Sequence, residues 1–219
     1  MAEHTIDLGA LPPEGAIELL IWRARAINGY AELEQSLCSL FATLTGSPMD
    51  VAATIFYRIT NSHSRNGILE SLPERKFKTQ FEAYWYGIPN TPHKRGLFTL
   101  IKQLDQTRNQ VVHWHTMANI TAKEDGTNDV LMTLTGPNFW MGGDTPALTA
   151  ADLRQFVDKA SFTSRSINMF LMIACLDVPV NAATRQTWLG IFQQPCIYPI
   201  ADTHPLSPNY KEPENPSVT

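Results

Sequence analysis

The chain has 219 residues, a formal net charge of −4, 43% hydrophobic residues and 17% charged residues. This length and apolar content suit one globular domain with appendages, and they exclude a chain that is disordered throughout. The negative net charge argues against a general nucleic-acid coating protein, because such proteins depend on a cationic surface.

Neither the apolar runs nor the N-terminus indicates a membrane or secreted protein. The longest apolar run, Met169–Leu176, is far shorter than the roughly 20 residues that span a bilayer. The first residues lack the basic and apolar regions of a secretory signal. The three cysteines, Cys38, Cys175 and Cys196, are widely spaced in apolar stretches, which suits reduced thiols. We therefore expect a cytoplasmic protein without membrane association.

The first half of the chain shows apolar residues at helical spacing. This periodicity predicts helices over about 13–44, 50–72 and 94–113, with a shorter aromatic segment over 77–86. Glycine and proline residues separate these segments. We expect core packing for the aromatic side chains of the short segment, with base stacking as the alternative: Phe77, Phe81, Tyr84, Trp85 and Tyr86.

The second half of the chain combines a hairpin, one long helix and a proline-rich end. Two β-prone runs flank a polar turn at 124–127, which predicts a β-hairpin over about 116–136. Thr149 and Asp152 have the spacing of a capping box, in which the hydroxyl and the carboxylate bond to exposed amides at a helix start. The helix that follows is expected to end near Leu176, before a short amphipathic piece at 184–192.

Together these elements define the expected fold class. We predict a mainly α protein, an up-and-down bundle of about four long helices with an inserted small β-hairpin and an extended Pro-rich C-terminal tail. The expected boundaries are a bundle domain at 1–178 and a C-terminal short helix and tail at 179–219.

Positive charge gathers locally despite the negative total. From Pro73 to Arg108 the chain has seven Lys and Arg against three Asp and Glu, a local charge of +4. A solvated helix face and a phosphate-attracting patch are both consistent with this window.

The end of the helix over 94–113 is the candidate functional segment. Leu97, Ile101 and Leu104 belong to its apolar seam, and Arg108 lies on or beside that seam. Asn109 and His113 form a polar stripe next to it. A guanidinium at an apolar surface needs a partner, because burying it unpaired is costly. One interpretation is purely structural, an Asp105–Arg108 ion pair that anchors the helix end.

The segment Arg108-Asn109-Gln110-Val111-Val112-His113 supports a second interpretation. It resembles the R-x(4–6)-H signature of the HEPN superfamily, with four intervening residues and a polar residue after the arginine. The segment 52–59, which reads AATIFYRI, and the predicted helical bundle fit the same family. The resemblance covers roughly residues 13–176.

The resemblance implies RNA cleavage without metal, at a composite site where two protomers meet. A neutral imidazole would take the proton from a ribose 2′-hydroxyl, and a second imidazolium would protonate the leaving 5′-oxygen. Arg108 would hold the phosphate oxygens as negative charge develops, and Asn109 would orient the imidazole or the phosphate. A twofold dimer would supply His113 from each chain. No cofactor is implied.

One position departs from a pattern within the family. In HEPN toxins paired with nucleotidyltransferases the signature continues to R-x(4)-H-x-Y, and the tyrosine accepts nucleotidyl groups. His115 stands at that position here, and we regard it as a substrate-binding residue or a second acid or base. Some HEPN proteins are non-catalytic, so the alternative is a dimerising module that binds RNA, a nucleotide or a protein partner such as an antitoxin.

Two further groups of residues were considered. Arg58 and Arg65 are seven residues apart on the predicted second helix, either as a solvent-facing stripe or as contacts to RNA phosphates. His113 and His115, with His93 or His63, could suggest zinc binding. No H-E-x-x-H or paired-cysteine pattern accompanies them, so we expect no metal site.

Overall fold

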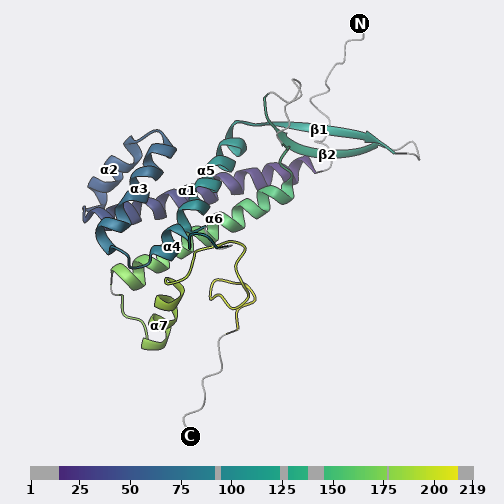
Figure 1. Ribbon diagram of the computed structural model, residues 1–219. Helices are drawn as coiled ribbons and strands as arrows, with labels where there is room; N and C mark the ends of the chain where they lie inside the picture. The colour runs from purple at the N-terminus through teal and green to yellow at the C-terminus, as the bar shows by residue number, and fades with distance from the viewer. Residues whose placement is uncertain (1–14, 92–94, 124–127, 138–145, 177, 212–219) are drawn as a thin grey trace.

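The computed structural model describes residues 15–91, 95–123, 128–137, 146–176 and 178–211. This part of the chain is mainly helical with one hairpin (Figure 1). Its elements are α1 (Ala16–Thr45), α2 (Met49–Arg58), α3 (Ser62–Phe77), α4 (Glu82–Tyr86), α5 (Leu97–His113), β1 (His115–Ala122), β2 (Asn128–Thr135), α6 (Ala150–Phe170), the π-helical turn η2 (Leu171–Cys175) and α7 (Ala182–Ile191). The predicted helical bundle with an inserted hairpin is confirmed.

The centre of the bundle is the pairing of α1 with α6, and α5 contacts both helices. Leu19, Leu33 and Leu37 of α1 are fully buried. They lie on one face of the helix, as their spacing predicts. At the α1–α6 contact the hydroxyls of Ser36 and Ser164 share a hydrogen bond of 2.8 Å, so the polar groups that the pairing buries are satisfied.

The predicted helix over 50–72 is two helices, and that prediction was wrong. The chain leaves helical geometry at Ile59, which has extended backbone angles, and α3 begins after Asn61. The Asn61 side chain accepts a hydrogen bond of 3.1 Å from the Ser64 amide, because asparagine at this position caps a new helix better than it continues an old one. The new helix also passes through Pro73, where we expected a stop.

The aromatic residues of the short segment form the densest part of the core. Tyr84 and Trp85 are almost completely buried, and both rings pack on Phe170 at the end of α6, with centroid distances of 5.5 and 4.6 Å. Phe192, just after α7, packs on Phe170 at 5.0 Å. The prediction of core packing for these aromatics is confirmed, and base stacking is excluded for Tyr84 and Trp85 by their burial.

The hairpin was predicted correctly in place and pairing. β1 and β2 are antiparallel, with His115 opposite Thr135, while the turn at 124–127 lies outside the described residues. The base of the hairpin is fixed by Leu134, which exchanges two backbone hydrogen bonds of 2.8 Å with Leu148. From there the hairpin projects beyond the helices at the end where α1 begins and α5 ends (Figure 1).

The start of α6 has the predicted capping box. The Thr149 hydroxyl accepts from the Asp152 amide at 3.3 Å, and the Asp152 carboxylate accepts from the Thr149 amide at 2.8 Å. Two of the amides that a helix start leaves without partners are thereby satisfied. Within the described ranges, no helix has both the length and the apolar character needed to cross a bilayer.

The described part of the C-terminal tail, 193–211, is irregular and folds against the bundle. Tyr198 packs on Phe162 of α6 at a ring-centroid distance of 5.7 Å. His204 lies between Phe162, at 5.6 Å, and the buried Trp188 of α7, at 5.8 Å. The final residues, 212–219, are outside the described part of the chain.

The contact of His204 predicts acid sensitivity of the docked tail. Burial lowers the pKa of His204 below its ordinary value near 6.5. As the pH falls below about 6.5, the unfolded chain therefore binds a proton before the folded one, and stability decreases until the folded pKa is passed. We expect a lower urea midpoint at pH 5.5 than at pH 7.5.

The matched control is His204→Phe, which keeps an aromatic ring but has no titratable group. We expect this variant to lose part of the difference between the two urea midpoints, as followed by tryptophan fluorescence. An identical difference in the wild type and the variant would show that His204 does not contribute to the acid sensitivity.

Candidate functional site

The candidate site lies at the junction between α5 and β1. The helix ends at His113, and Trp114 turns the chain into extended geometry while its amide still donates to the Gln110 carbonyl at 2.9 Å. His115 is therefore the first residue of β1. Our placement of His113 and His115 on one helix was wrong, because the helix stops between them.

Arg23 of α1 holds this junction. Its Nε donates to the Val111 carbonyl at 2.9 Å, and its Nη2 donates to the carbonyls of Val112 and Trp114 at 3.0 Å each. The last carbonyls of a helix have no partner within the helix, and a cation is favourable at this negative end. One guanidinium thus fixes the end of α5 and the first step toward β1.

Trp114 adds a packing contact to the same junction. Its side chain packs against the core, and a Cβ added at Gly136, just after β2, would lie 3.3 Å from the Trp114 ring. That separation is tighter than an ordinary contact, so glycine lets the end of the hairpin approach the indole. The residue between the two histidines is therefore held from both sides.

Arg108 is half-buried and has two polar or aromatic neighbours. Its Nη1 donates to Asn109 Oδ1 at 3.1 Å, and its guanidinium carbon lies 5.5 Å from the centroid of the Tyr30 ring, within the range of a cation–π contact. Among the described residues it forms no ion pair within 4 Å. The expected Asp105–Arg108 ion pair is thus not formed.

Asp105 has a different role from the one considered. Its carboxylate accepts hydrogen bonds of 2.8 Å from Tyr30 on one oxygen and from Ser62 on the other. Burial, together with the nearby charge of Asp105, raises the pKa of Tyr30 well above its ordinary value, so its hydroxyl remains a donor. Asp105 therefore joins α1, α3 and α5 directly beneath Arg108.

The three remaining predicted residues at this end are exposed. Asn109, His113 and His115 all lie at the surface, and Asn109 is one helical turn before His113. Neither imidazole has a hydrogen bond or an ion pair with any described residue. Exposed imidazoles beside a guanidinium can exchange protons and contact phosphate oxygens, which is the chemistry of phosphodiester cleavage.

The structure separates Arg58 from Arg65. Arg58 is exposed in the last turn of α2, whereas Arg65 is buried in α3 with only 7% of its surface exposed. Arg65 forms an ion pair with Glu34 of α1, and its guanidinium carbon lies 4.6 Å from the centroid of the Phe56 ring. The predicted common face of these two arginines does not exist, because the helix breaks between them.

Sequence reasoning missed Arg23 and Tyr30, which both belong to α1. The available signal was a cation inside an apolar-periodic helix, since such a residue needs acceptors from another element. Nothing in its local sequence says that these acceptors are backbone carbonyls 88 to 91 positions away.

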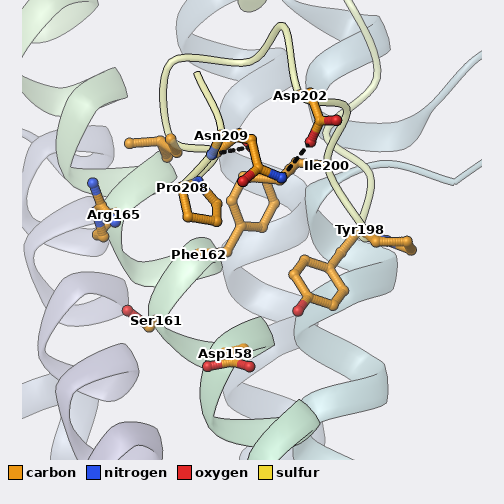
Figure 2. A pocket seen from close by; sticks show the side chains of 12 residues that line it. Asp158, Ser161, Phe162, Arg165, Tyr198, Ile200, Asp202, Pro208 and Asn209 are labelled. Atoms are coloured by element: carbon orange, nitrogen blue, oxygen red, sulfur yellow. Dashed lines mark hydrogen bonds between the residues drawn. The ribbon is translucent and has the colours of Figure 1, made fainter. Parts of the chain in front are cut away.

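A cavity of about 530 Å³ lies between α6 and the tail, apart from this junction. Figure 2 shows Asp158, Phe162 and Arg165 on one side, with Asn209 bonded to Asp202 at 3.0 Å on the other. None of the predicted site residues lines it. We therefore centre the functional argument on the junction.

Comparisons with family models, with curated proteins and with solved structures found no match. Within the residues that the structure describes, His, Cys, Asp and Glu side chains nowhere form a group of three or more that could hold a metal ion. The functional argument therefore rests on the residues of the junction.

The Arg65–Glu34 ion pair predicts a large effect of one substitution. Glu34→Ala would leave the buried guanidinium without its counter-charge, and we expect a loss of about 2–4 kcal/mol in the free energy of unfolding. The control is Glu32→Ala, an exposed residue of the same helix. Urea denaturation would measure both, and equal effects would contradict the structural importance of the pair.

The Arg23 contact predicts local loosening of the junction. In Arg23→Ala three carbonyls lose a charged donor, and we expect a cost of about 2 kcal/mol in stability. Hydrogen exchange of the amides at 110–116 should become faster, while that of α6 stays unchanged. Arg25→Ala is the control, since Arg25 is exposed on the same helix and stacks on Trp22 at 4.7 Å. Unchanged exchange in Arg23→Ala would contradict the assigned role.

Proposed function

We propose that the protein is a metal-independent endoribonuclease of the HEPN type, acting as a homodimer. The observation that carries the proposal is the arrangement at the end of α5. Arg108, Asn109 and His113 lie within two turns of one helix, and the histidine is exposed and unengaged within the described structure. The R-x(4)-H segment and the helical bundle fit the same family.

The reaction divides between two copies of His113. One imidazole, in its neutral form, accepts the proton of the ribose 2′-hydroxyl as the 2′-oxygen attacks phosphorus. The other, as imidazolium, donates a proton to the departing 5′-oxygen, which leaves a 2′,3′-cyclic phosphate. One chain has one such histidine, so the proposed site is completed by the second chain.

Arg108 and Asn109 act on the phosphate. The guanidinium stacks over the Tyr30 ring and bonds to Asn109, which limits its motion before substrate arrives. Preorganised donors stabilise the charge that develops on the non-bridging oxygens without a cost of reorganisation. We assign His115, at the start of β1, and exposed Arg58 to contacts with flanking nucleotides; Arg65, paired with Glu34, is not assigned such a contact.

One observation favours a second candidate function. Arg108 already has partners within its own chain, as a structural arginine would. The alternative is a non-catalytic dimerising module of the same family that binds RNA, a nucleotide or a protein partner, for example an antitoxin. Phage defence, a toxin–antitoxin pair and stress response are settings that suit either function.

The test is cleavage of total RNA by purified protein in EDTA. We expect the wild type to yield fragments with 2′,3′-cyclic or 3′-phosphate ends, and His113→Ala to lose at least about 100-fold of the rate, the typical contribution of acid–base catalysis. Arg108→Ala should fall similarly. A circular dichroism spectrum that matches the wild type would show that each variant is folded.

His115→Ala is the matched control, because it removes an exposed imidazole two residues from the proposed catalytic one. We expect this variant to weaken RNA binding and to keep the same fragment ends. If neither the wild type nor any variant cleaves RNA, the binding module becomes the function to pursue. Equal cleavage by the wild type and His113→Ala would rule out the proposed site.

A further inference from the structure

An exposed apolar stripe follows the outer face of α1. Its aliphatic members are unusually exposed, with Ile17 at 57%, Leu20 at 50%, Ile21 at 48% and Ile27 at 44%. Ala24, Asn28 and Ala31 continue the same face and are also exposed. These positions recur every three or four residues, which is the spacing of a helix seam that packs against another helix. We call this surface the α1 stripe.

The α1 stripe is separate from the face of α1 that builds the core. Leu19, Ala26 and Leu33 point into the bundle and are fully buried, so α1 has apolar residues on two faces. A surface helix of a monomer needs only one such face. A contiguous exposed apolar patch usually marks a contact with another molecule.

The position of the stripe relative to the candidate site is set by Arg23. The stripe runs from Ile17 to Ala31, so its midpoint is Ala24. Arg23, the preceding residue, holds the carbonyls at the end of α5. The junction with His113 therefore lies on one flank of the stripe, level with its midpoint.

We propose that the α1 stripe is the surface on which a second copy of this chain docks, with the two α1 helices antiparallel and Ala24 at the twofold axis. A twofold interface joins the same patch of both subunits. In an antiparallel pair related in this way, the same flank of each helix lies on the same side of the dimer. The two α5 ends therefore face the same side, near the axis.

The area that a dimer needs supports the inclusion of the candidate site. A stable interface takes about 20–30 residues and about 800 Å² from each partner, whereas the stripe offers seven residues. The remainder must come from adjoining surface, and the end of α5 adjoins the stripe midpoint through Arg23. This places Asn109 and His113 at the edge of the interface, where two imidazoles can share one substrate.

This inference rests on the proposed function for its catalytic part only. Sedimentation of the wild type should show a dimer, and Ile21→Glu should give a folded monomer, because Ile21 is exposed and contributes to the stripe. The control is Ile68→Glu on α3, which exchanges a similarly exposed isoleucine, at 42%, outside the stripe. We expect it to remain a dimer.

Cross-linking tests the register. Cys38 and Cys196 are buried, so Cys175→Ser removes the most accessible native thiol. In this background Ala24→Cys should form a disulfide between copies under mild oxidation, because equivalent residues meet at the axis. Ala31→Cys should not, since seven residues along each helix place its two copies about 21 Å apart. The same yield for both variants would overturn the antiparallel register.

The outcomes separate the interface from the chemistry. A wild-type monomer at all concentrations, or an Ile21→Glu dimer, would overturn the docking surface whether or not RNA is cleaved. A dimer through α1 without nuclease activity would keep the interface and reject the proposed function. If Ile21→Glu is a monomer and still cleaves RNA at the wild-type rate, the site is complete in one chain and the inference that docking assembles it is wrong.

Discussion

The contact on which the junction depends is the one between the Arg23 guanidinium and three backbone carbonyls near the end of α5. It supplies donors where a helix has none of its own, and it does so from the central helix of the bundle. Through this contact the position of His113 is fixed relative to α1, and so is the point where the chain turns into the hairpin.

A second polar contact supports the first from below. Asp105 accepts from Tyr30 and Ser62, which draws α5 toward both α1 and α3. The aromatic ring of Tyr30 then provides the surface on which Arg108 stacks. A charged side chain at the rim of an apolar core is costly unless such partners are present, so the same residues that stabilise the bundle also orient the proposed phosphate-binding group.

The two faces of α1 connect the fold with the proposed assembly. The inner face builds the core with α6, while the outer stripe leaves four aliphatic side chains about half exposed. If the stripe is covered by a second copy, the helix that organises one chain also organises the dimer. The composite nuclease site and the docking surface would then depend on a single element.

The sequence by itself determined the fold class, the hairpin, the capping box at Thr149 and the burial of the aromatic segment, because these depend on local spacing and propensity. It also placed Arg108, Asn109 and His113 near one helix end. Only the tertiary structure decided the partners of Arg108, the separation of Arg58 from Arg65 and the role of Arg23. Those features depend on contacts between residues far apart in the chain, and on where Asn61 and Trp114 end helical geometry, which periodicity alone does not reveal.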